Sequence, residues 1–162
     1  MSRKIIVTAV IAGLVGFIAG NAFWYLASPL WFDRVVDEAL PAELQITTLA
    51  SGAFRDADAV HRGAGTATVY ESATGARVLR LSDFSVTNGP DLKVWLVAAK
   101  NPATSADVTG GDWRALGPLK GNIGDQTYPI PADLNLDDYG AVVIWCEQFS
   151  VLFAAADLAS AR

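Results

Sequence analysis

The amino-acid sequence predicts a mainly β protein, an antiparallel β-sandwich with a Greek-key-like strand order, preceded by one N-terminal transmembrane α-helix. An uncharged apolar run covers residues 5–26, and beyond it β-branched and aromatic runs alternate with Gly, Asn, Asp and Pro. The 162 residues leave room for one compact domain besides a span. We therefore expect an N-terminal transmembrane signal-anchor (1–32), a juxtamembrane connector (33–43) and an extracytoplasmic β-sandwich domain (44–162).

The apolar run has the length and flanks of a membrane span. About 22 uncharged residues suffice to cross a hydrocarbon core of about 30 Å as a helix. Five aromatics gather at its C-terminal end, as in an interfacial aromatic belt: Phe23, Trp24, Tyr25, Trp31 and Phe32. Basic residues precede the run and acidic residues follow it, so the positive-inside rule predicts a single-pass cell-membrane protein with a cytoplasmic N-terminus.

A cleaved signal peptide is the alternative interpretation of the same run. Gly20-Asn21-Ala22 offers a weak cleavage site. The apolar stretch is long for a signal peptide, however, and hydrophobic residues continue past that site. We therefore expect an uncleaved anchor.

The connector and the domain differ in their local patterns. Residues 33–40, DRVVDEAL, predict a short helix that ends before Pro41. The following pattern predicts eight strands, with a hairpin turn at residues 73–75 and a tight turn at residues 88–91 in which Gly89 can adopt positive φ. The predicted strands are Thr47–Arg55, Gly65–Tyr70, Arg77–Phe84, Leu92–Ala98, Trp113–Leu116, Gln126–Ile130, Ala141–Glu147 and Ser150–Ala155.

Charge and the scarcity of two residue types exclude several functions. The net charge is −5 and the basic residues are scattered, so no cationic footprint for a nucleic acid is present. A single cysteine, Cys146, cannot form an intrachain disulfide. With a single histidine, His61, a tetrahedral Cys/His zinc site cannot be built, and we expect no metal site.

Four segments, taken in order, resemble one known family, the DM-thirteen or electron-transfer DM domain, which in animals occurs beside DOMON domains. The segments are HRGAGTAT (61–68), LRLSDFSVTNGPDL (79–92), LGPLKGNIGDQ (116–126) and VVIWCEQFSVLF (142–153). The resemblance extends from about residue 48 to residue 158. The anchor and connector are also similar to the bacterial membrane-anchored form.

The resemblance implies a redox role centred on a cysteine in the penultimate strand, which is Cys146 in this chain. That cysteine would act as a free thiol or as a ligand of a prosthetic group such as haem, and it would exchange electrons with a redox partner protein. Relatives often carry histidine where this chain has Lys93. If that histidine is a cofactor ligand, Lys93 weakens the case for a cofactor.

Strand alternation gives Cys146 two interpretations. Val142, Ile144 and Cys146 share one apolar face, so the thiol is expected in the core, where burial makes it inert. The functional interpretation makes it a redox group, with His61 as a helper or as a further haem or metal ligand. Trp145 could relay an electron, but alternation sends it to the opposite face.

The remaining candidates are less specific. Asn88 and Asp91 flank the tight turn and could contact a ligand, although such side chains usually bond their own backbone. We expect the large aromatics to fill the sandwich core: Trp95, Trp113, Trp145, Phe149 and Phe153. The alternative to a redox module is a non-catalytic extracytoplasmic binding or structural module with Cys146 in the core. A hydrolase is disfavoured because no G-x-S-x-G motif or oxyanion-hole signature is present.

Overall fold

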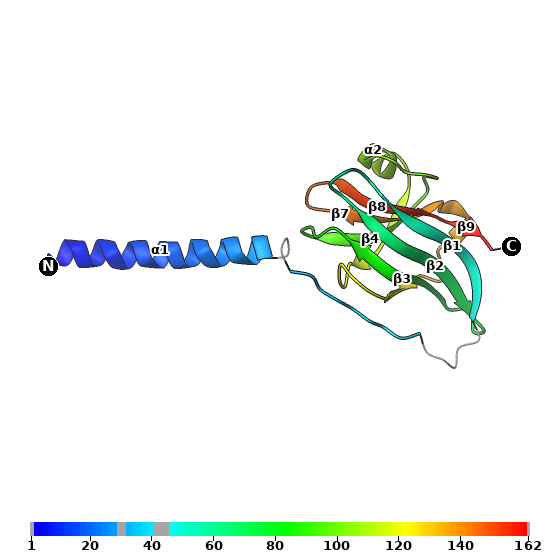
Figure 1. Cartoon of the computed structure of the whole chain (residues 1–162), viewed down its shortest axis with the longest axis horizontal. Coiled ribbons are helices and arrows are strands. Elements are labelled where there is room, and N and C mark those ends of the chain that lie inside the picture. Colours follow the sequence, from blue (N-terminus) through cyan, green and yellow to red (C-terminus); the bar gives the residue numbers. More distant parts are fainter. Residues whose placement is uncertain (1, 29–31, 41–45, 162) are drawn as a thin grey trace. The chain divides into compact units, whose positions relative to one another are not determined.

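The computed structural model describes residues 2–28, 32–40 and 46–161, and the chain divides into two units, 1–32 and 33–162. Helix α1 (Arg3–Ala27) makes up most of the first unit (Figure 1). Its residues 3–25 are long enough to cross a membrane, and an 18-residue window within them has a mean hydropathy of 2.2. Trp31 of the predicted aromatic belt lies outside the described residues.

The second unit is almost entirely antiparallel β structure. The mainly β fold predicted from the sequence is confirmed, and each of the eight predicted strands is present with small shifts at its ends. A short strand and two short helices were not predicted. The elements are β1 Ile46–Asp56, β2 Gly63–Ser72, β3 Arg77–Val86, β4 Leu92–Val97, α2 Ser105–Thr109, β5 Trp113–Pro118, β6 Gln126–Ile130, a 3-10 helix Leu136–Asp138, β7 Ala141–Cys146, β8 Val151–Asp157 and β9 Ala159–Ser160.

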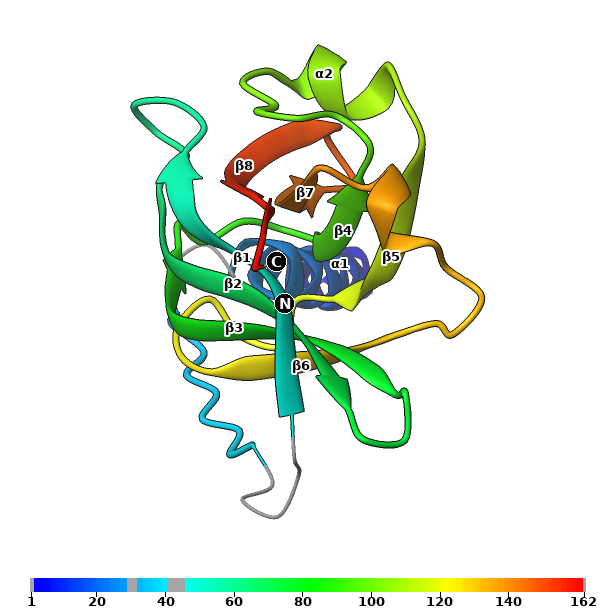
Figure 2. The same cartoon turned by 90° about the vertical axis from the view of Figure 1, so that its right-hand side faces the viewer.

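One strand joins the two halves of the sheet. The strand order is β5-β4-β7-β8-β1-β2-β3-β6, with β9 added to β1. The first part of β1 pairs with β2, whereas its last residues, Phe54 to Asp56, pair with β8. The end strands β5 and β6 contact each other, so the sheet nearly closes on itself around the main hydrophobic core (Figure 2).

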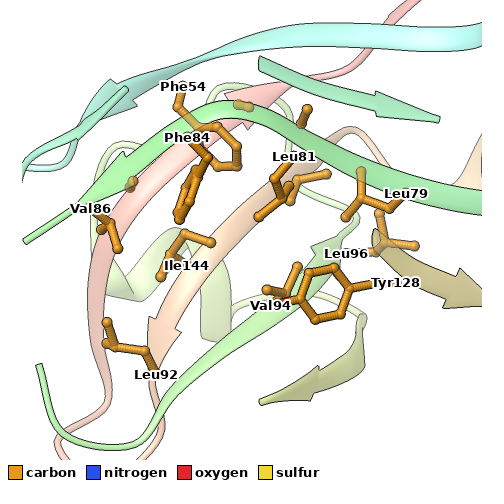
Figure 3. Packing of buried hydrophobic residues seen from close by; sticks show 14 of the residues in the cluster. Phe54, Leu79, Leu81, Phe84, Val86, Leu92, Val94, Leu96, Tyr128 and Ile144 are labelled. Atoms are coloured by element: carbon orange, nitrogen blue, oxygen red, sulfur yellow. The ribbon is translucent and has the colours of Figure 1, made fainter. Parts of the chain in front are cut away.

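The main core fills the space between the two halves. Leu79 and Leu81 of β3 face Val94 and Ile144 of the opposite half, and all four are fully buried (Figure 3). Burial of one such side chain contributes about 1.5–3 kcal/mol. The alternating apolar residues of β3 and β7 therefore hold the halves together.

A second buried cluster lies on the outer face of β4, β7 and β8, beneath α2. It contains Trp95 and Trp145 together with Val108 of α2. Of the five aromatics expected to fill the core, three are buried: Phe153 in the main core, and Trp95 and Trp145 in the second cluster. The expectation was wrong for Trp113 and Phe149, which are 47% and 62% exposed.

The connector is extended, and the predicted helix at residues 33–40 is absent. Val36 N–H donates to Ile123 O (2.9 Å), and Glu38 N–H donates to Asp125 O (3.0 Å). The segment 121–125 thus takes the hydrogen bonds that a helix would make internally. The β-branched pair Val35-Val36 favours this outcome because branching at Cβ lowers helix propensity. Residues 41–43 of the predicted connector lie outside the described residues.

Glu38 fastens the connector to the domain. Its carboxylate accepts hydrogen bonds from Lys120 Nζ (2.7 Å) and from Thr127 N–H (2.8 Å). The Lys120 ammonium lowers the pKa of Glu38 below its ordinary value. The ionised form therefore stabilises this contact above the ordinary carboxyl pKa, and the stabilisation is lost as pH falls through the lowered value.

We expect Glu38→Gln to raise hydrogen exchange at Val36 and Glu38 several-fold, because the ion pair that fastens the connector is lost. In the native chain, the protection factors of the same amides should fall as pH drops below about 4.5. Asp37→Asn is the matched control, since Asp37 is exposed one residue away. Unchanged protection in Glu38→Gln, or protection that is insensitive to acid, would contradict this account.

Candidate functional site

Three turns meet at one end of the sheet, around the end of β7. They are residues 57–62 between β1 and β2, residues 87–91 between β3 and β4, and residues 147–150 between β7 and β8. Thr87 N–H donates to Arg62 O (2.9 Å), and Glu147 N–H donates to Asp91 O (3.2 Å). These backbone contacts join the turns, which we call the thiol-end turns.

Cys146 is the last residue of β7 and is fully buried. It pairs with Leu92 of β4 on one side and with Val151 of β8 on the other. Its thiol donates a hydrogen bond to Pro90 O at 3.0 Å. The predicted alternation is observed, because Val142, Ile144 and Cys146 face the main core and Trp145 faces the second cluster.

Burial raises the pKa of the Cys146 thiol, since the thiolate would lose its hydration. The negative charge of Asp91 raises that pKa further. The backbone N–H groups of Phe149 and Gln148 interact with the sulfur and oppose these effects, but they do not overcome burial. Cys146 is therefore a neutral thiol at physiological pH.

Lys93 ties two of the thiol-end turns together from the outer face of the sheet. Its Nζ lies 2.7 Å from Asp91 Oδ1 in one turn and 3.5 Å from Glu147 Oε2 in another. The hydrogen bond to Asp91 raises the pKa of Lys93, so the ammonium persists at neutral pH. Lys93 therefore forms an ion-pair clasp across two thiol-end turns.

Gly89 allows the 87–91 turn to lie against the core. A Cβ at this position would lie 2.6 Å from the ring of Phe153, which excludes any larger residue without movement. The predicted positive φ is at Asp91 (φ 53°) and not at Gly89. Glycine is therefore required here for close approach to an aromatic ring.

His61 lies in the 57–62 turn and contacts its own neighbours. Its Nδ1 is 2.7 Å from Asp58 Oδ2, and its ring centroid is 4.3 Å from that of Phe153. Hydrogen bonds from the His61 side chain and from the backbone lower the pKa of Asp58 to about 2. No hydrogen bond joins His61 to Cys146 in the part of the chain that the structure describes.

Asn88 and Asp91 are both engaged by the protein itself. Asn88 Nδ2 donates to Asp33 Oδ1 (3.0 Å) in the connector, and Asp33 also accepts from Asn122 Nδ2 (2.7 Å). Asp91 is paired with Lys93. These contacts replace the bonds to their own backbone that the sequence favours, and they give both residues structural partners.

The geometry around Cys146 does not fit a haem. An axial sulfur ligand needs open space for the macrocycle, whereas the Cys146 sulfur is enclosed and hydrogen-bonded to Pro90. Neither Cys146 nor His61 lines any of three cavities found among the described residues, of about 350, 380 and 440 Å³. In the described residues, no three His, Cys, Asp or Glu side chains gather as a metal site requires.

We expect Lys93→Gln to speed alkylation of native Cys146 by a few-fold. Partly exposed ion pairs contribute about 0.2–1 kcal/mol each, and loss of both should favour opening of the thiol-end turns. The measurement is the alkylation rate of the native chain, with the denatured chain as the upper limit. Lys100→Gln is the matched control, since Lys100 is exposed and makes no ion pair among the described residues. Equal rates in the two variants would show that the clasp does not enclose the thiol.

Comparison with known protein families gives a match over the part of the chain that carries this site. A family model described as Electron transfer DM13 matches residues 54–158, a span that contains the three thiol-end turns and Cys146. No curated protein and no solved structure matches the chain. Because the matched span covers well over half of the chain, this protein belongs to the DM13 electron transfer family.

Proposed function

We propose that the β domain transfers single electrons, with Cys146 as the group that is oxidised and reduced. The observation that carries this proposal is the family match, which includes the chain's one thiol in its penultimate long strand. A redox partner protein accepts the electron. The oxidised state is a Cys146 thiyl radical, formed when the sulfur loses one electron and the S–H proton.

The enclosure of Cys146 selects this chemistry over other thiol reactions. Disulfide exchange and alkylation both require a thiolate that the other reactant can touch. Cys146 is neutral and fully buried beneath Pro90, so both reactions are slow in the native protein. A buried thiol can still give an electron to a partner protein, because electron transfer does not require the partner to touch the sulfur.

The proposal gives His61 no direct part and uses neither haem nor metal. His61 is bound to Asp58 and packs against the Phe153 ring, and among the described residues it makes no hydrogen bond through which it could take the thiol proton. Asn88 and Asp91 position the turn that covers Cys146. The predicted ligand roles of these residues are not needed for electron transfer.

We place the domain on the outer side of the cell membrane. Support comes from α1, which is long and apolar enough to span, and from Arg3 and Lys4 at its N-terminal end. In this arrangement the anchor keeps the domain near membrane-bound redox partners. The thiol lies outside the reducing cytoplasm, where burial protects it from adventitious oxidation.

Complete burial of Cys146 also favours a second candidate, a non-catalytic structural module. In that case the thiol acts as a small apolar group, as buried cysteines commonly do. The two candidates differ in whether native Cys146 can lose an electron.

We expect anaerobic titration of the native full-length chain with hexachloroiridate(IV), a one-electron oxidant, to separate the candidates. The native chain should consume one equivalent more than Cys146→Ala and should lose its thiol. Glutathione disulfide should leave the thiol intact over the same period, and the absorbance spectrum should lack a Soret band. Equal consumption by both chains, with the thiol retained, would establish the structural module instead.

A further inference from the structure

Three tryptophan rings form a continuous row from the surface to the residue beside Cys146. The rings of Trp113 on β5 and Trp95 on β4 are stacked, with centroids 4.0 Å apart and planes 8° apart. The rings of Trp95 and Trp145 on β7 have centroids 5.3 Å apart. We call these three residues the tryptophan row.

Strand pairing fixes this row in the sheet. Trp95 lies opposite Val143 of β7 and opposite Ala115 of β5, so its neighbours across the sheet bring Trp145 and Trp113 to its two sides. Trp113 is 47% exposed, whereas Trp95 and Trp145 are 4% and 2% exposed. The row therefore has one end at the surface and the other inside the second cluster.

The buried part of the row is unusual in its hydrogen bonding. Trp95 Nε1 is buried without a hydrogen-bond partner, the one such side-chain atom among the described residues. Buried indole N–H groups usually find an acceptor. Without an acceptor, an oxidised Trp95 cannot pass its proton to a neighbour, so it remains a radical cation that is readily reduced again.

We propose that the tryptophan row is the path along which electrons travel between Cys146 and a one-electron oxidant that contacts Trp113. This inference rests on the proposed redox function of Cys146. Trp145 and Cys146 are consecutive residues, so the last step runs through the short covalent link between their side chains. The row thus connects a fully buried thiol with the surface without exposing it.

The steps balance as one electron and one proton. The oxidant takes one electron from Trp113. The resulting electron hole moves through Trp95 to Trp145, and Cys146 then supplies the electron that fills it. The S–H bond of Cys146 breaks, and its proton is released to water at the half-buried 87–91 turn, toward which the hydrogen bond to Pro90 O directs the thiol. The products are a reduced partner, three neutral tryptophans, a thiyl radical and a released proton.

The other aromatic contact near the thiol-end turns is a poor competitor. The His61 ring packs at a tilt against Phe153, which lies in the same core as Cys146. A phenylalanine ring is far harder to oxidise than an indole, so this pair of rings cannot carry an electron hole by hopping. The tryptophan row is the pathway with oxidisable side chains at each step.

The test is flash oxidation of the native full-length chain in detergent by a photogenerated ruthenium(III) polypyridyl complex, followed by transient absorption of the indole radical. In the native chain, this radical should decay at least tenfold faster than in Cys146→Ala, because Cys146 reduces it. Trp95→Phe keeps a packed ring but interrupts the row, so its radical should persist as in Cys146→Ala. Trp24→Phe, a change in α1, should leave the fast decay intact.

Trp113→Phe provides a second test that is independent of folding in the interior, because Trp113 is partly exposed. It should abolish the fast-decaying signal while circular dichroism stays unchanged. Fast decay retained in both Trp95→Phe and Trp113→Phe, but lost in Cys146→Ala, would overturn the row and leave the redox role of Cys146 standing. Equal decay in the native chain and Cys146→Ala would overturn the row, and the iridate titration would then decide the redox role independently.

Discussion

Burial of β7 on both faces is the constraint on which the rest of the domain depends. Each edge of this strand is hydrogen-bonded, to β4 on one side and β8 on the other. One face packs into the main core, and the other lies in the second cluster beneath α2. A strand in this position must be apolar throughout, as AVVIWC is. Its last residue, Cys146, therefore enters the interior with its neighbours, and the turns that follow β7 and precede β4 close over the thiol.

Enclosure of the thiol and its proposed redox role are compatible because they involve opposite faces of the same strand. On the core face, burial beneath Pro90 keeps reagents away from the sulfur and keeps it protonated. On the outer face, Trp145 continues into rings that reach solvent at Trp113. The connector also contacts this end of the domain, because Asp33 accepts a hydrogen bond from Asn88 in the turn that contains Pro90. The sulfur is thus shielded from reagents on one face of β7, while electrons reach it through the side chains on the opposite face.

The sequence was sufficient for the strands but insufficient for what lies between them. Period-two alternation and turn residues predicted all eight long strands and the face on which Cys146 lies. The helix predicted for the connector was wrong because the connector is hydrogen-bonded to the segment 121–125. That segment is distant in sequence, so the local pattern of the connector does not show it. The second cluster was not predicted for a similar reason: alternation assigns a residue to a face, but only the sheet order shows that the outer face of β7 is also covered. Neither the Lys93 clasp nor the tryptophan row could be found, since both depend on the register of strands that are far apart in the chain.

The central claim is that electrons leave Cys146 while the thiol stays enclosed. Its most direct test compares two rates on the same native full-length chain, oxidation of Cys146 by an outer-sphere oxidant and alkylation of Cys146 by a thiol reagent. Alkylation requires the turns to open, whereas electron transfer does not. The account predicts that oxidation is faster by orders of magnitude and that Lys93→Gln accelerates alkylation alone. If the two reactions have equal rates and Lys93→Gln accelerates both, then both require the thiol-end turns to open, and the claim is contradicted.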